Sequence, residues 1–247
     1  SPSNQGLSLL MKLITKHKFA REEGIRTLLY ALQKNNKALN LFINQFKGLN
    51  LLFALFMKPL SKRGIENLVE IFAQIVNFND ASAHVRLIRK FKEKNFEKTD
   101  RLCSIFLEYH DQLSNFEQEV KSGSYINLLI EVDSIQDQDE LEERILEDRL
   151  KNGLFLLRLI SKIIAYVCDE QVRNRILLHL KPRKLSIDDI ADILEEYLDF
   201  LPDYQIGRDR EHGITTWLNT RGYQFGGTIG KKFSFYSSGF ENQARFN

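Results

Sequence analysis

The sequence predicts an all-α protein: an armadillo/HEAT-like helical solenoid with a C-terminal helical cap and an irregular tail rich in glycine and aromatic residues. Apolar residues recur at helical spacing from Gln5 to beyond residue 200. A leucine-rich pattern returns after 42 residues, at Gly6 and again at Gly48. The run from Leu150 to Cys168 is apolar around nearly its whole circumference, which indicates a central helix buried on every side.

The 42-residue echo pairs GLSLLMKLI, which begins at Gly6, with GLNLLFALF, which begins at Gly48. Armadillo and HEAT repeats have periods of about 40–47 residues and contain two or three helices each. We expect the glycine to open the third helix of each unit, at a place where the backbone turns sharply. The period and the helix count together favour a solenoid of stacked helical units.

The other helices follow from the same spacing and from the residues that interrupt it. Asparagine and serine are good N-caps, and proline prevents a helix from continuing. A loop is expected from Lys121 to Gln136, where Ser-Gly-Ser breaks the pattern. The predicted helices cover residues 5–17, 21–34, 37–46, 49–57, 65–78, 82–91, 97–120, 150–168, 172–180, 187–201 and 210–219.

These elements suggest three regions. Residues 1–125 are expected to form armadillo-like repeats, and residues 126–220 a C-terminal helical subdomain that continues the solenoid. Residues 221–247 contain five glycines and seven aromatic residues with almost no aliphatic ones. Such a tail lacks the residues for a core of its own, so a disordered tail and a hairpin docked by its rings both remain open.

Composition limits the function. A net charge of +2 argues against electrostatic binding of nucleic acid by the whole chain, so direct RNA contact is not expected. Cys103 and Cys168 lie within apolar helical patterns and are interpreted as buried thiols. The five histidines are far apart and pair with no cysteine at metal-ligand spacing. We therefore expect no catalytic activity, no cofactor and no membrane insertion. Because the chain begins Ser-Pro-Ser, we expect it to be a fragment of a longer protein.

Two charged features are candidates for partner binding. Between Asp133 and Asp148 there are eight acidic residues and a single base, Arg144, which is more acid than helix capping requires. Either this is a solvated acidic linker, or its carboxylates attract a cationic partner. Within the central helix, Arg158 and Lys162 are four residues apart and share a face, which is expected to reach solvent or an acidic partner. The candidate partner-binding residues are Asp139, Glu140, Glu142, Glu143, Arg158 and Lys162.

The order and spacing of three segments resemble the C-terminal half of the β-catenin-like protein 1 family. The segments are GLNLLFALFMKP (48–59), NFEKTDRLCSIFLEYHDQL (95–113) and EDRLKNGLFLLRLISKIIAYVCD (147–169). The resemblance covers about Gly6 to Leu201 and does not extend to the aromatic tail. It implies an armadillo-type nuclear protein associated with the spliceosome, in the assembly around the Prp-nineteen ubiquitin ligase and its Cdc-five-like, Myb-type partner.

The resemblance also implies a scaffold without catalytic activity that binds basic segments of its partners in the nucleus. Independently of the resemblance, a helical solenoid is equally consistent with a general armadillo adaptor for nuclear transport or trafficking. The sequence leaves a homodimer open.

Overall fold

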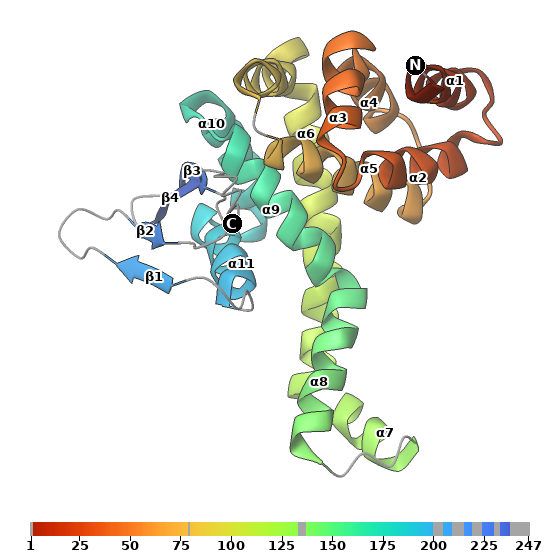
Figure 1. The fold of residues 1–247 in the computed structure, drawn as a ribbon. Helices are drawn as coiled ribbons and strands as arrows, with labels where there is room; N and C mark the ends of the chain where they lie inside the picture. Colours follow the sequence, from red (N-terminus) through yellow and green to blue (C-terminus); the bar gives the residue numbers. More distant parts are fainter. Residues whose placement is uncertain are drawn as a thin grey trace, which may run out of the picture.

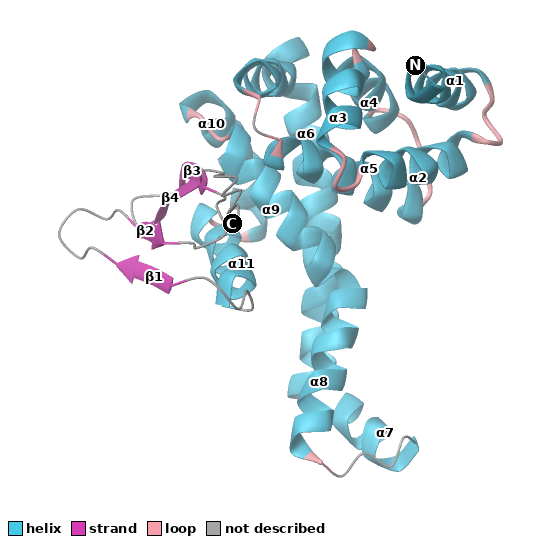
Figure 2. Cartoon of the chain, in the orientation of Figure 1, coloured by secondary structure: helices cyan, strands magenta, loops and turns pink. Residues whose placement is uncertain are grey.

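The computed structural model describes residues 2–78, 80–132, 137–199, 205–208, 215–218, 224–229 and 233–237. The structure consists of a helical body and an arm that projects from it (Figures 1 and 2). The arm is formed by two antiparallel helical segments, with a short helix at its tip. The helices are α1 Pro2–Lys16, α2 Arg21–Leu32, α3 Asn36–Asn40, η1 Leu41–Gln45, α4 Gly48–Phe56, α5 Lys62–Asn77, α6 Ala81–Lys121, α7 Ser124–Val132, α8 Gln138–Arg149, η2 Leu150–Leu154, α9 Phe155–Val167, α10 Glu170–Leu180, η3 Lys181–Arg183 and α11 Ile187–Asp199.

The N-terminal helices stack in order: α1 packs on α2, α2 on α5, and α5 on α9. Their boundaries follow ordinary capping chemistry. Asn35 accepts a hydrogen bond from the backbone N–H of Ala38 at the start of α3, and Ser61 accepts one from Gly64 at the start of α5. The helices predicted from periodicity over residues 5–78 are all present, within a few residues at each end.

The role expected for the repeated glycine, to open a helix where the backbone turns sharply, is wrong at Gly6 and holds in part at Gly48. Gly6 lies inside α1, and an added Cβ there would meet nothing within 4 Å. Gly48 does begin α4, but the left-handed backbone conformation belongs to its neighbour Lys47, whose φ is 54°. A Cβ at Gly48 would lie 2.5 Å from the ring of Phe42. Close packing of that ring therefore favours glycine at position 48, where the chain enters α4.

The helix α6 is two helices joined by a tight turn. Glu93 is extended, and the next three residues, Lys94, Asn95 and Phe96, all have positive φ of 51° to 64°. The sequence predicted two helices on either side of this joint, at residues 82–91 and 97–120. The second part of α6 packs on α9 and α10 and then continues into the projecting arm.

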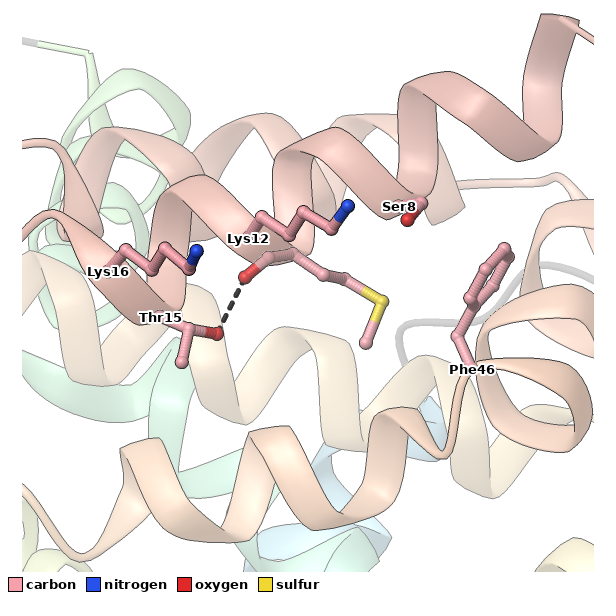
Figure 3. A pocket seen from close by; sticks show the side chains of 6 residues that line it. Ser8, Lys12, Thr15, Lys16 and Phe46 are labelled. Carbon is pink, nitrogen blue, oxygen red and sulfur yellow. Dashed lines mark hydrogen bonds between the residues drawn. The ribbon is translucent and has the colours of Figure 1, made fainter.

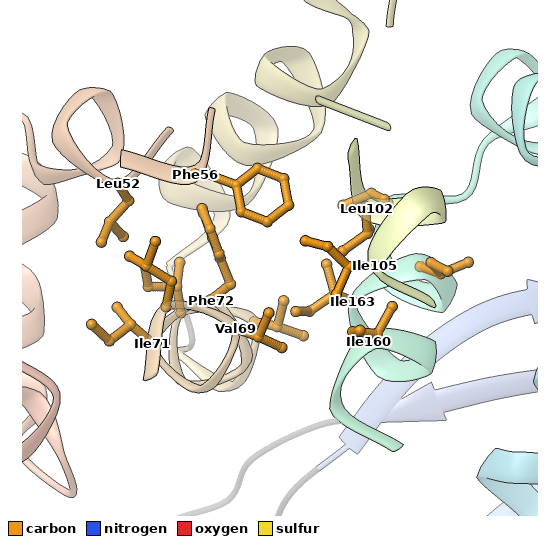
Figure 4. Close-up of a cluster of buried hydrophobic side chains, with 14 of the residues drawn as sticks. Leu52, Phe56, Val69, Ile71, Phe72, Leu102, Ile105, Ile160 and Ile163 are labelled. Atoms are coloured by element: carbon orange, nitrogen blue, oxygen red, sulfur yellow. The ribbon is translucent and has the colours of Figure 1, made fainter. Parts of the chain in front are cut away.

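The central helix is confirmed as buried, but it is not one straight helix. Its first five residues form the π-helical turn η2, with non-helical backbone at Asn152 and Gly153, and α9 follows. Leu157, Ile160 and Ile163 of α9 are fully buried. They belong to a single hydrophobic cluster that extends from α1 to α11, and part of this cluster is shown in Figure 4. The core is therefore continuous across the boundary expected near residue 125, which falls inside α7.

Beyond α11 the described residues are strands. The helix predicted over residues 210–219 is wrong, because Thr215–Leu218 forms strand β2 and pairs antiparallel with β1, Gln205–Arg208. Threonine and tryptophan in TTWL favour a strand, and only four residues of this segment are described. In the tail, β3 (Gln224–Ile229) pairs antiparallel with β4 (Phe233–Ser237), and β3 lies against α9 and α11. Of the two expectations for the tail, these residues follow the docked hairpin.

No single helix in the described part of the chain is long and apolar enough to cross a membrane. One bent pair, residues 36–45 and 48–56, passes the same test by length and composition. Its large apolar side chains, including Phe42, Leu52 and Phe56, are fully buried in the helical core.

Candidate partner-binding site

The acidic segment lies on the projecting arm, where α8 returns along the second part of α6 (Figure 1). Three contacts hold the arm together. Arg149 at the end of α8 donates to Glu117 of α6 at 2.9 Å. Tyr125 of α7 packs its ring on Phe116, with centroids 4.9 Å apart, and donates its hydroxyl to Asp148. The segment is therefore a helix held on a defined scaffold, and not a linker, over the residues that are described.

The acidic residues of α8 divide into those used by the arm and those that face solvent. Asp137 caps the helix by accepting from the N–H of Asp139 at 2.8 Å. Asp148 accepts from Tyr125 and pairs with Lys151 at 2.9 Å. Partial burial acts to raise the pKa of Asp148, but the bonds from Tyr125 and Lys151 outweigh it and hold this pKa below its usual value. Glu147 forms an ion pair with Lys151 at 3.5 Å.

The four carboxylates proposed from the sequence are not used by these contacts of the arm. Asp139, Glu140, Glu142 and Glu143 are all exposed, and Glu142 accepts a hydrogen bond only from the neutral side chain of Gln138, at 2.7 Å. Within the described ranges, no lysine or arginine lies within ion-pair distance of any of them. We call these four residues the acidic face of α8. Four carboxylates within five residues of one helix create a local negative potential that attracts cationic segments.

The expectation that Arg158 and Lys162 reach solvent is wrong for Arg158, which is buried, and the alternative, an acidic partner, holds for it. Arg158 is 8% exposed; it donates to Glu196 of α11 at 3.3 Å and lies over the ring of Tyr197 at 5.6 Å. The acidic partner of Arg158 is thus supplied by the same chain. Lys162 is half-buried, and this burial lowers the pKa of its amine to about 8. Neither cation joins the acidic face.

Arg158 instead belongs to an ion-pair network that fixes the arm to the body. Glu196 of α11 accepts from Arg158 and also from Arg149 at 2.7 Å, while Arg149 reaches Glu117 of α6. The network joins α6, α8, α9 and α11 at the base of the arm. These bonds tie the C-terminal end of α8 to α6 and α11.

Sequence reasoning missed one feature of the arm. Residues 124–132, expected to be part of a loop, form α7 at the tip. Leu128 and Ile130 of α7 are 54% and 48% exposed, whereas Leu129 between them is buried. The signal was present in the apolar run YINLLIEV, but nine residues are too few to distinguish a helix from a strand or loop by periodicity.

The described residues contain no candidate metal centre. No three histidine, cysteine, aspartate or glutamate side chains in the described ranges come close enough to hold a metal ion. Cys103 is buried and Cys168 is partly buried. Burial raises the pKa of the Cys103 thiol to about 12 and that of Cys168 to about 11, so both stay protonated and unreactive at neutral pH.

Comparison with known sequences agrees with this helical architecture. The family described as catenin-beta-like, Arm-motif containing nuclear proteins matches residues 2–195. The chain belongs to this catenin-beta-like family. The predicted all-α armadillo-type fold and the family resemblance are thereby confirmed, since the match covers every described helix except the last turn of α11.

Within the catenin-beta-like family, the chain is similar to β-catenin-like protein 1 of Homo sapiens, with 27% identity over 84% of this chain and 39% of the human protein. The Bos taurus protein of the same name is 26% identical over 84% of this chain and 38% of its own length. The homologue of Schizosaccharomyces pombe is 27% identical over 63% of this chain and 27% of its length. The chain thus spans about two-fifths of the length of the mammalian relatives it matches.

Proposed function

We propose that this chain is a non-catalytic interaction scaffold of the nuclear pre-mRNA splicing machinery that binds lysine- and arginine-rich segments of partner proteins. The observation that carries the proposal is the acidic face of α8, with four exposed carboxylates that no lysine or arginine among the described residues neutralises. These residues belong to α8 on the arm that projects from the helical body (Figure 1), and their side chains are exposed to solvent.

Family membership supports the cellular setting. The description of the matching family includes the word nuclear, which supports a nuclear location for this chain. The resemblance implies partners in the assembly around the Prp-nineteen ubiquitin ligase, and foremost the Cdc-five-like, Myb-type factor. Such partners bring basic segments, which complement the acidic face.

Affinity purification from nuclear extract, followed by mass spectrometry, tests this function. The bait is the whole chain, compared with a variant in which Asp139, Glu140, Glu142 and Glu143 are changed to lysine. Splicing proteins recovered with the unchanged chain and lost with the variant are the expected result. Recovery of importins or coat proteins without splicing factors would refute the splicing role and support a transport or trafficking adaptor. Equal recovery of splicing proteins by both baits would show that they bind elsewhere.

A further inference from the structure

The short helix at the tip of the arm exposes aliphatic side chains. Leu128 and Ile130 of α7 are each about half exposed, whereas Leu129 between them is buried. Tyr125 and Leu129 lie one helical turn apart on the inner face of α7, and from this face the hydroxyl of Tyr125 donates to Asp148 of α8. At about 100° per residue, Leu128 and Ile130 lie on the two flanks of the inner face. A chain that binds beside α7 therefore meets an aliphatic side chain on either flank.

The tip of the arm is built from the middle of the chain. It consists of the C-terminal part of α6, of α7 and of α8, and Figure 1 shows it pointing away from α1. The α7 sequence SYINLLIEV contains no lysine or arginine. Both arginines of α8, Arg144 and Arg149, already pair with other acids of the chain. The cations of α7 and α8 therefore do not oppose the approach of a basic segment.

The aliphatic side chains and the acidic face lie within reach of one peptide segment. The hydrogen bond from Tyr125 to Asp148 ties the start of α7 to the end of α8. At the other end, only four residues separate Val132, the last residue of α7, from Asp137, the N-cap of α8. With a rise of about 1.5 Å per residue, Asp148 is about 12 Å from Glu140 along α8. These two ties place the exposed side chains of α7 within about 20 Å of the acidic face, a distance that about six residues of an extended chain span.

We propose that α7 is the second half of the partner site and binds a pair of aliphatic residues in the partner, which lie about six residues from the lysine- and arginine-rich run that the acidic face attracts. This inference rests on the proposed function and adds which basic segments the site selects. The carboxylates speed the encounter, because electrostatic attraction acts mainly on association. Burial of the aliphatic pair against Leu128 and Ile130 then slows dissociation, since related complexes differ in affinity mostly through the dissociation rate.

Charge favours this occupant over other classes of partner. RNA and anionic membranes would be repelled by the acidic face. A second copy that docks through the same tip would bring two acidic faces together, which is unfavourable. A run of lysines and arginines without aliphatic residues would leave Leu128 and Ile130 in water, and it would gain the electrostatic attraction alone.

A hollow of about 230 Å³ elsewhere on the chain does not suit the same segment. It lies beside α1, where Met11 and Phe46 make it apolar and Lys12 and Lys16 stand along its edge (Figure 3). These two amines would repel a lysine- and arginine-rich run. The tip of the arm is therefore the surface to test with such a segment.

Fluorescence anisotropy and stopped-flow measurements with the full chain test the proposal. The probe is a labelled peptide with two leucines, a glycine and serine spacer of about six residues, and a run of lysines and arginines. A second probe places the leucines on the other side of the run, and the tighter of the two is used. The control peptide has serines in place of the leucines.

The variant L128A/I130A should weaken binding of the leucine probe about tenfold, mainly through faster dissociation, and should leave the control peptide unchanged. Alanine preserves the helix, because it has the highest helix propensity, and circular dichroism should show unchanged helix content. The matched variant V85A/L178A truncates two exposed aliphatic side chains on the helical body. It should change the binding of either peptide less than about twofold.

The variant E140K/E143K separates the two halves of the site. If it weakens both peptides while L128A/I130A weakens neither more than V85A/L178A does, the acidic face stands and the role of α7 is refuted. If E140K/E143K leaves both peptides unchanged, or if neither peptide binds, binding of basic segments by the acidic face is refuted, and the role of α7 with it. Equal binding of the leucine probe and the serine control would also overturn the role of α7. So would a dimer of the chain that L128A/I130A dissociates, because a second copy would then occupy α7.

Discussion

Replacing Gly153 by alanine should destabilise the base of the arm, where η2 joins α9. Gly153 has φ of +118°, a conformation that residues with a Cβ rarely adopt. An added Cβ would also lie 3.0 Å from the carbonyl oxygen of Tyr109 and 3.2 Å from its ring, on the facing helix α6. Backbone strain of this kind costs about 1–3 kcal/mol, and the close contact adds to it. We expect Gly153→Ala to lower the free energy of unfolding by about 2–4 kcal/mol in total.

The assay is equilibrium unfolding in urea, with Gly123→Ala as the matched control. Gly123 also has positive φ, at +79°, but a Cβ there would meet nothing within 4 Å. Its replacement should therefore show the backbone strain alone, at about 1–2 kcal/mol. The difference between the two variants measures the packing of α6 against η2. Equal losses at the two glycines, or a gain at Gly153, would refute the close approach described here.

Three further predictions concern the core and its charges. Leu157→Ala or Ile163→Ala should each lower the free energy of unfolding by about 2–5 kcal/mol, because both side chains are fully buried; a loss below about 0.5 kcal/mol in a denaturant melt would place the core elsewhere. A hydrogen bond from Asn44 holds the pKa of Asp80 at about 2, so the stability that this carboxylate contributes is present above pH 4 and is lost as the pH falls towards 2. Asp80→Asn should therefore flatten this part of the acid unfolding curve, and an unchanged curve would contradict the assignment. Because burial lowers the pKa of Lys162 to about 8, Lys162→Met should raise the melting temperature at pH 7, where the amine is charged. This gain in melting temperature should shrink as the pH rises from 8 towards 10.5, and a gain that does not depend on pH would contradict the prediction.

Periodicity located most helices because each has one buried face, so apolar spacing and capping residues carried the signal. It failed where contacts between distant residues decide the structure. The residues around Asn152 do not reveal that Tyr109, on another helix, lies close to Gly153, where the central helix bends. The strand at Thr215–Leu218 was mistaken for a helix because a short segment can satisfy both patterns.

The candidate site was predictable in part. The sequence contains more acidic residues here than helix capping requires. The four residues chosen from them are exposed and form no ion pair with a described residue. Which acids the arm uses was not visible, since Asp148 depends on Tyr125, 23 residues earlier in the chain. Arg158 could not be assigned either, because Glu196 on α11 lies 38 residues away and approaches only after folding.

The central claim is that the acidic face of α8 accelerates the association of basic segments. Stopped-flow measurement of the association rate of a labelled lysine- and arginine-rich peptide, over a range of salt concentrations, tests it most directly. The variant E140K/E143K is compared with D188K/D192K, which makes the same change in net charge at two exposed acids of α11. The account predicts slower association and a flatter salt dependence for E140K/E143K, and near-normal behaviour for D188K/D192K. Identical rates for both variants at low salt would contradict it.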